Sequence, residues 1–195
     1  MEIMEKNDGG EKSQFIYYDN FFNHDYYNNI LKWLNNLTFI KGFKNSGNKI
    51  DREQIWFDNN NNYFCKIWKN KQERWMPHPY DDMLTTIQNN IIKKLNIEVD
   101  TCLINKYNSG KDIISAHKDS QYSFGEYPTI IIYSLGCQRD MKINSDISKE
   151  SFIIPLKPNS CFIMKGASQK YFTHEIIKNN ENSVRYSLTF RRYIN

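Results

Sequence analysis

The chain has 195 residues and a formal net charge of +4, and this length suits one domain with its own hydrophobic core. A sequence pI near 8.7 permits a polyanionic partner, but it is less basic than the charge that would by itself indicate one. No apolar run approaches the length of a membrane span, and the polar N-terminus lacks the apolar stretch of a signal peptide. We therefore expect an intracellular protein, nuclear or cytoplasmic, that is neither membrane-bound nor secreted.

The cysteine pattern favours buried free thiols over disulfides or a zinc site. The four cysteines lie far apart without a Cys-x-x-Cys spacing, at Cys65, Cys102, Cys137 and Cys161. Free thiols are typical of a reducing compartment, in agreement with the expected intracellular location.

In the first half of the chain, helical spacing and turn residues predict the elements. Residues 1–13 are polar and predict a disordered tail, and residues 14–195 are expected to form a single domain. Its first part, residues 14–95, should hold helices and substrate-recognition hairpins. The pattern predicts a short strand at 15–18, helices at 24–37 and 80–95, a turn at 45–48 and a loop at 59–62.

Short apolar segments recur at regular spacing over residues 96–195. They predict strands near 101–107, 129–135, 141–144, 152–155, 161–165, 172–177 and 186–193. Several short strands in succession are typical of a sandwich or barrel, so the fold class is α+β and mainly β. A small barrel filled mostly by side chains can still hold one small ligand.

Three side chains in this region form a candidate iron site. His117 and Asp119 are two residues apart, so on an extended segment they point the same way while Lys118 faces elsewhere. His174 would join them from a distant strand. Two imidazoles and one carboxylate on one face of Fe(II) leave the opposite positions open for a cosubstrate and oxygen. The alternatives are a solvated His-x-Asp loop and a purely structural histidine cluster.

The last predicted strand carries a basic, hydroxyl-bearing face. Arg185, Ser187, Thr189 and Arg191 alternate with apolar residues. Arginine grips carboxylates with two parallel hydrogen bonds, so this face suits a small dicarboxylic acid. Two further candidates, Asn105 and Tyr107, would add an amide and a phenol to the same pocket. The alternative is a surface strand whose basic face lies in water.

Four blocks of residues share an order and spacing that extend these patterns. They are Asn105-x-Tyr107-x-x-Gly110-x-Asp112-x-Ile114-x-x-His117-x-Asp119, Ser134-Leu135-Gly136, Gly166-x-x-Gln169-x-x-x-x-His174 and Arg185-x-Ser187-x-Thr189-Phe190-Arg191. Together they resemble the AlkB-type dioxygenases that use Fe(II) and 2-oxoglutarate, and within that family the nucleic-acid demethylases. The likeness covers about residues 15 to 195. It implies a double-stranded β-helix, or jelly roll, with N-terminal helices packed outside.

The resemblance also implies cofactors and residue roles. His117, Asp119 and His174 would bind Fe(2+), and 2-oxoglutarate and molecular oxygen would be the cosubstrates. Arg185, with Asn105 and Tyr107, would hold the far carboxylate of 2-oxoglutarate, and Arg191 would assist at its keto acid end. Ser187 and Thr189 complete the cosubstrate face. The implied activity is oxidative demethylation of a nucleic-acid base, as in DNA repair, with release of formaldehyde and succinate by a monomeric enzyme.

Basic and aromatic side chains alternate before the predicted jelly roll, as a surface that stacks an extruded base requires. The candidate substrate-binding residues are Phe43, Arg52, Tyr63 and Phe64, with Tyr63 or Phe64 stacking on the base. A hairpin with alternating core aromatics would give the same string. On this substrate side the chain departs from the closest DNA-repair members, because neutral Ser120 and Gln121 follow Asp119 where those members carry acidic residues.

Three other functions stay open. An RNA demethylase would share every motif with a DNA demethylase. A peptidyl hydroxylase of the same fold would share the metal triad, but such enzymes usually anchor 2-oxoglutarate with one basic residue. A catalytically silent jelly-roll binding module would not need three ligands and two arginines.

Overall fold

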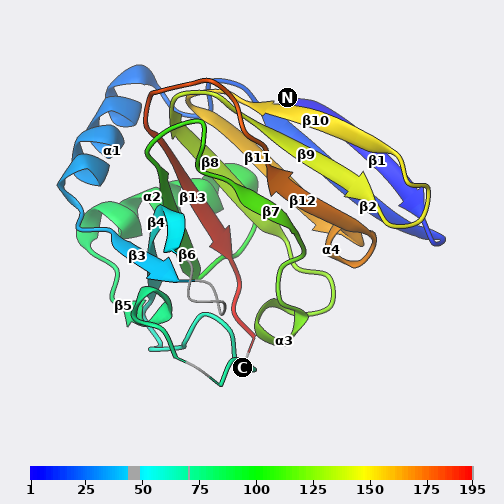
Figure 1. Ribbon diagram of the computed structural model, residues 1–195, viewed down its shortest axis with the longest axis horizontal. Coiled ribbons are helices and arrows are strands. Elements are labelled where there is room, and N and C mark those ends of the chain that lie inside the picture. The colour runs from blue at the N-terminus through cyan, green and yellow to red at the C-terminus, as the bar shows by residue number, and fades with distance from the viewer. Residues whose placement is uncertain (44–48, 70, 195) are drawn as a thin grey trace.

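Two sheets stacked face to face form the body of the computed structural model, which describes residues 1–43, 49–69 and 71–194 (Figure 1). Every strand pair is antiparallel in the described residues except β4 with β5. The prediction of a mainly β domain with helices outside is confirmed. The predicted turn at residues 45–48 falls outside the described residues.

The larger sheet runs in the spatial order β1-β2-β11-β8-β13-β6-β4-β3, and β5 pairs with β4. Its strands are β1 Glu2–Asp8, β2 Glu11–Tyr18, β3 Ile40–Phe43, β4 Lys49–Asp58, β5 Pro77–His78, β6 Thr101–Tyr107, β8 Ile130–Gly136, β11 Ser160–Gly166 and β13 Arg185–Arg191. The smaller sheet has the order β10-β9-β12-β7. Its strands are β7 Ile114–His117, β9 Arg139–Ser145, β10 Ser151–Leu156 and β12 Phe172–Ile176.

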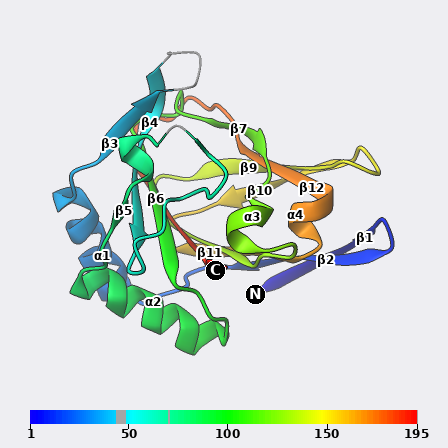
Figure 2. The ribbon, with the colours of Figure 1, turned by 90° about the horizontal axis from the view of Figure 1, so that it is seen from below.

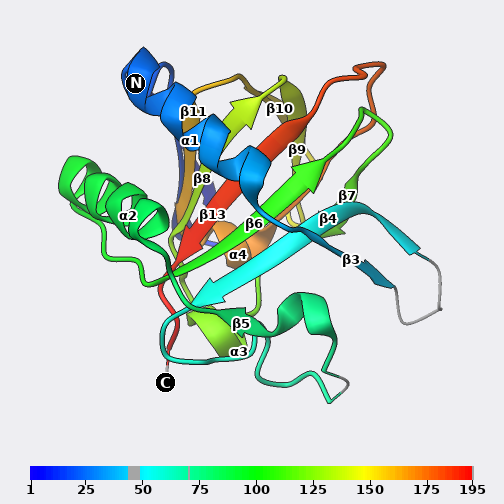
Figure 3. The same ribbon diagram turned by 90° about the vertical axis from the view of Figure 1, so that its left-hand side faces the viewer.

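Two long helices, α1 His24–Asn36 and α2 Asp82–Leu95, cover the outer face of the larger sheet (Figures 2 and 3). Each begins at a capping side chain, since Asn23 accepts from the Tyr26 amide and Asp81 from the Leu84 amide. Short helices lie at η1 Glu73–Trp75, α3 Gln121–Phe124 and α4 Ser168–Tyr171. Among the described residues, no helix has the length and apolar character needed to cross a membrane.

The alternation of β13 separates the hydrophobic core from the space between the sheets. Tyr186, Leu188 and Phe190 pack with the helices in one buried apolar cluster. The polar residues of the same strand face the other way, toward the smaller sheet. Strand β6 lies beside β13 in a register that places Tyr107 opposite Arg185 and Asn105 opposite Ser187. The sequence predicts these four residues for one pocket, and their side chains lie on the same face of the larger sheet.

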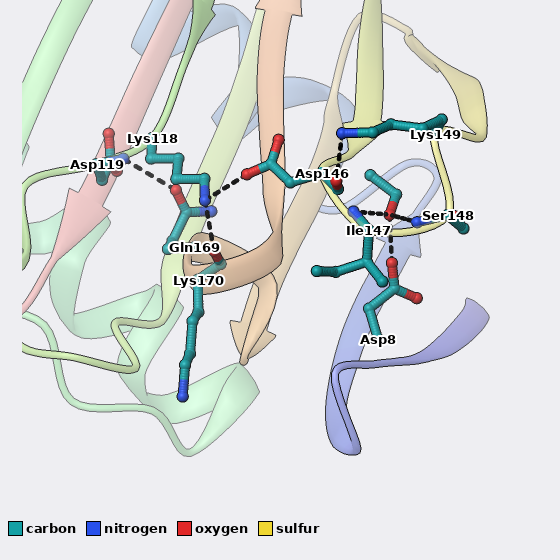
Figure 4. Close-up of polar contacts among 10 residues, drawn as sticks. Asp8, Lys118, Asp119, Asp146, Ile147, Ser148, Lys149, Gln169 and Lys170 are labelled. Carbon is teal, nitrogen blue, oxygen red and sulfur yellow. Dashed lines mark hydrogen bonds and ion pairs between the residues drawn. The ribbon is translucent and has the colours of Figure 1, made fainter.

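The prediction of a disordered tail at residues 1–13 is wrong. These residues form β1 and the first part of β2, and β2 pairs with β11 at the edge of the larger sheet. Gly9 and Gly10, both with positive φ, make the turn between the strands. The Ser145 hydroxyl donates to the Asp8 carboxylate and anchors the hairpin (Figure 4). A polar edge hairpin resembles a disordered tail in sequence, because few of its side chains need to be buried.

A buried arginine connects the segment before β7 to the end of β12. Arg139 donates to the carbonyl oxygens of Ser109, Gly110, Asp112 and Ile177 at 2.8 to 3.1 Å. Its side chain is fully buried. These bonds give a buried guanidinium four carbonyl acceptors from two separate segments of the chain. Arg139 thereby holds β7 in place beside β12.

Candidate metal and cosubstrate site

A cavity of about 630 Å³ opens between the two sheets. This volume lies in the range of small-molecule sites. Its lining contains all nine residues that the sequence predicts for the metal and cosubstrate, namely Asn105, Tyr107, His117, Asp119, His174, Arg185, Ser187, Thr189 and Arg191. These residues come from four separate segments of the chain. The fold therefore brings the whole predicted set to one enclosed space.

His117, Asp119 and His174 converge at one end of the cavity. One candidate ligand atom from each residue lies within 4.8 Å of the others. His117 pairs directly with His174 across β7 and β12, with ring centroids 4.2 Å apart, and Asp119 follows the end of β7. The Lys118 ammonium points away from them and forms an ion pair with Asp146 at 2.6 Å (Figure 4). This geometry agrees with the alternation expected from the sequence.

Neighbouring groups form hydrogen bonds to two of the three residues. The Nδ1 of His117 lies 2.8 Å from the Ser115 carbonyl oxygen, and a proton donated there leaves the Nε2 lone pair as the ligand. The backbone amide of Asp119 donates to the Gln169 side chain at 3.0 Å (Figure 4). His174 is buried, and its Nδ1 has no hydrogen-bond partner among the described residues. Two imidazoles and one carboxylate in this arrangement fit a divalent iron ion.

The protonation states also suit a metal site. Burial lowers the pKa of both imidazoles, that of His174 to about 3, so both rings are neutral at pH 7. Burial alone would raise the pKa of Asp119, but the Arg191 guanidinium and the two histidines outweigh it and lower this pKa to about 2. The Arg191 Nε and Nη2 donate to the Asp119 carboxylate at 2.6 and 3.2 Å. All three side chains are therefore in the protonation state that metal binding requires.

These pKa shifts predict that the metal-free protein loses stability in mild acid. The unfolded chain binds protons near the ordinary histidine pKa of 6.5, whereas the folded protein keeps His174 neutral down to about pH 3. Because the unfolded state binds more protons in this window, the free energy of unfolding falls as the pH is lowered. We expect a fall of roughly 1 to 2 kcal/mol between about pH 6.5 and 5, measured by urea unfolding. His174→Phe should flatten the profile; an equally steep profile in that variant would contradict the assignment.

The opposite end of the cavity is suited to a carboxylate. Arg185 is buried, and its Nη2 donates to the Ser134 hydroxyl at 2.9 Å. Its Nε and Nη1 have no partner among the described residues. Tyr107 lies beneath the guanidinium, 5.0 Å from ring centroid to Cζ. A buried guanidinium with two unsatisfied nitrogens strongly favours an anionic ligand.

Two neighbouring side chains, Gln54 and Arg52, hold Asn105 in place, and the sequence predicted neither contact. The Asn105 Oδ1 accepts from Gln54 Nε2 at 2.7 Å and from Arg52 Nε at 3.2 Å. The amide nitrogen of Asn105 is therefore the group that can donate to a ligand. Gln54 was not predicted, because a glutamine within a strand of mixed polar and apolar residues carries no distinctive pattern.

The four substrate candidates separate into two pairs. Arg52 and Phe64 line the cavity, and Phe64 stacks on Trp75 with centroids 4.4 Å apart. Phe43 and Tyr63 are not part of the cavity lining. The Tyr63 hydroxyl accepts from the Gln72 amide, so the ring is held by the loop it belongs to. Trp68, a member of the same aromatic string, lines the cavity and is partly exposed instead.

Comparison with known proteins identifies relatives of this arrangement. A family model described as the 2OG-Fe(II) oxygenase superfamily matches residues 14–191. The human alpha-ketoglutarate-dependent dioxygenase alkB homolog 3 is 27% identical over 150 residues, 72% of this chain and 51% of that protein. The DNA oxidative demethylase ALKBH2 of Arabidopsis thaliana is 26% identical over 113 residues, 46% of this chain and 36% of that protein. The chain thus spans about half the length of the alkB homolog 3 proteins that it matches.

Comparison with solved structures establishes the fold. The structure of OsALKBH1 superposes with a TM-score of 0.68 at 15% identity and covers 91% of this chain and 97% of that one. A prolyl hydroxylase from Trichoplax adhaerens, solved with a peptide fragment, gives 0.62 at 12% identity and covers 92% and 83%. At these identities the likeness establishes the fold alone. The predicted jelly roll is confirmed.

Proposed function

The chain belongs to the 2OG-Fe(II) oxygenase superfamily and is of the AlkB type, and we propose that it oxidatively removes N-alkyl groups from nucleic-acid bases. The observation that carries this proposal is the single cavity in which the candidate metal triad faces a buried, incompletely bonded Arg185. The family implies Fe(II) and 2-oxoglutarate, and these two groups match the two ends of the cavity. The similarity to a DNA oxidative demethylase supports the substrate class.

We assign His117, Asp119 and His174 as the residues that would hold Fe(II), because they offer neutral nitrogen and ionised oxygen donors on one side of a shared space. Iron held there would, with molecular oxygen as the oxidant and 2-oxoglutarate as the co-reductant, supply the chemistry that hydroxylates an N-alkyl carbon, and the unstable product would release an aldehyde. Arg191 keeps the Asp119 carboxylate ionised and fixes its orientation. The enclosing sheets exclude bulk water from the reacting groups.

We assign Arg185 to the far carboxylate of 2-oxoglutarate, with the amide nitrogen of Asn105 and the Tyr107 side chain beside it. Ser187 and Thr189 lie between the two arginines on β13 and complete this wall. The residues are positioned before any ligand arrives, because β6 and β13 are paired over their whole length. The same wall disfavours monocarboxylates, which would leave the Arg185 nitrogens unsatisfied.

The base would enter from the end of the cavity where Phe64, Trp68 and Tyr122 gather. Trp68 and Tyr122 are exposed, so they are accessible to a nucleic-acid strand. A base must leave its stack before its alkyl group can reach the metal. We therefore propose a single strand or an extruded nucleotide as the substrate, stacked on one of these rings.

Product analysis on modified oligonucleotides tests this function. With Fe(II), 2-oxoglutarate and oxygen, we expect equal amounts of succinate and formaldehyde from at least one methylated oligonucleotide. The panel should carry 1-methyladenine, 3-methylcytosine, N6-methyladenine or 3-methyluracil, each in DNA and in RNA. An unmethylated oligonucleotide of the same sequence is the control and should yield no formaldehyde. Succinate without formaldehyde from every member would mean that 2-oxoglutarate turnover is not coupled to demethylation, which would contradict the proposed substrate class.

A further inference from the structure

We infer that the base-binding end of the cavity selects an alkylated base without a positive charge over cationic bases such as 3-methylcytosine and 1-methyladenine. This inference rests on the proposed function, because it names the class of base that the same site accepts. It follows from the distribution of charged side chains around the cavity.

The part of the cavity lining that the structure describes offers no carboxylate that a cationic base could use. Among the described residues of its lining, Asp119 is the single acidic side chain. Arg191 donates to both of its oxygens, at 2.6 and 3.2 Å, and the pair is almost fully buried. The same carboxylate is also the proposed ligand of a divalent cation. Its negative charge is therefore already compensated.

Positive side chains exceed negative ones in the same lining. Arg185 and Arg191 are both buried there and Arg52 also lines the cavity, opposite the one charge of Asp119. Lys118 is neutralised by Asp146, which lies outside the lining. The positive charge of Fe(II) and the negative charge of the 2-oxoglutarate dianion are equal in size, so binding of both would leave the net charge of the cavity unchanged. A cationic base would therefore meet a net positive surrounding in which water screens poorly.

Two rings of the aromatic lining, Phe64 and Trp75, already interact with arginines. A stacked ring pair can attract a cation through its π face. Here, however, Phe64 already lies 5.8 Å from the Arg191 guanidinium, and Trp75 lies 4.5 Å from that of Arg74. A second cation near these rings would be repelled by the arginines already present.

The residues after Asp119 suit a neutral base instead. Ser120, Gln121 and Tyr122 line the cavity and carry hydroxyl or amide donors without charge. A neutral N3-alkylated pyrimidine presents a carbonyl acceptor on each side of the alkylated nitrogen. Amide and hydroxyl groups can donate to both of these acceptors without carrying a charge. The same groups can also accept from the exocyclic amino group of 3-methylcytosine, so the selectivity rests on charge and not on the hydrogen-bond pattern.

Two oligonucleotides that differ in one base, which is neutral in one strand and cationic in the other, test the inference. One carries a central 3-methyluracil and the other 3-methylcytosine; both are methylated at N3 and nearly equal in size. Binding is measured by fluorescence anisotropy without oxygen, with Fe(II) and 2-oxoglutarate present, and formaldehyde release is measured in air. We expect at least about 10-fold tighter binding of the 3-methyluracil strand, a difference of about 1.4 kcal/mol. Equal binding, or tighter binding of the cationic base, would overturn the inference.

A variant that adds one negative charge provides the second test. Gln121→Glu adds a carboxylate of the same size at an exposed position beside the cavity, so the fold should be preserved. The preference for 3-methyluracil should fall by at least about 3-fold. The control Asn29→Asp adds the same charge at an exposed position of α1, remote from the cavity lining, and should leave the preference unchanged. An unchanged preference in Gln121→Glu would contradict the proposed role of charge.

Failure of the inference can be separated from failure of the proposed function. Comparable formaldehyde release from both strands would uphold demethylation and overturn the charge selectivity. Tighter binding of the 3-methyluracil strand without formaldehyde from either one would uphold the selectivity and count against demethylation.

Discussion

His117→Ala is expected to reduce turnover at least about 10³-fold, the scale of loss seen when a group at the reacting centre is removed. Two remaining ligands would not hold iron on one face of the cavity. The side chain lies at the end of β7 and is only partly buried, so the free energy of unfolding should change little. Formaldehyde and succinate release measure the activity, and thermal unfolding measures the fold.

His117 gives a cleaner test than Asp119. Removing the Asp119 carboxylate would leave Arg191 buried without its partner, which costs about 3 to 5 kcal/mol in comparable cases. Loss of activity in an Asp119 variant would then mix lost metal binding with lost stability. Titration with Fe(II) alone should show weaker binding by His117→Ala even before any substrate is added.

The other two histidines outside the cavity serve as controls. The chain has four histidines, and His24 and His78 are exposed, at the start of α1 and in β5. His24→Ala and His78→Ala should keep full activity and full Fe(II) affinity. Retained activity in His117→Ala, or equal losses in all three variants, would show that the metal ligands are wrongly assigned.

Arg185→Met is expected to weaken 2-oxoglutarate binding by about 10²-fold or more, because a carboxylate in this cavity would lose its two-bond partner. The variant keeps a side chain of similar length but removes the guanidinium that no other described group fully satisfies. Isothermal titration of the Fe(II)-loaded protein without oxygen measures the affinity. Arg185→Lys keeps the positive charge but lacks the planar guanidinium. Its affinity for 2-oxoglutarate should lie between that of the original chain and that of Arg185→Met.

The free energy of unfolding of Arg185→Met provides a test that is independent of the binding measurement. Without 2-oxoglutarate, Arg185→Met should be no less stable than the original chain, because the buried guanidinium has two nitrogens without partners. The stabilisation that saturating 2-oxoglutarate provides should disappear. Arg192→Met, at an exposed neighbouring position, should change neither property. Undiminished affinity in Arg185→Met would contradict the assignment of this arginine to the cosubstrate.

The sequence alone predicted the fold class and indicated which polar side chains of the last strand share one face. Alternation from Arg185 to Arg191 places the polar side chains on one side of the strand, and this period is a local property of extended backbone. The seven strands predicted after residue 96 correspond to β6 and β8 to β13. The spacing of His117 and Asp119 likewise defines which side chains can meet, since it depends on two neighbouring residues alone.

Contacts between distant segments decided the rest. Arg191 was expected at the keto acid end of the cosubstrate, and only the packing of β13 against the end of β7 shows that its guanidinium binds Asp119. Phe43, Tyr63 and Phe64 look alike in sequence, yet Phe64 alone lines the cavity. Residues 1–13 form a hairpin because β11 offers a free edge. Periodicity is local, whereas the neighbours of a side chain and the availability of a sheet edge depend on how the whole chain packs.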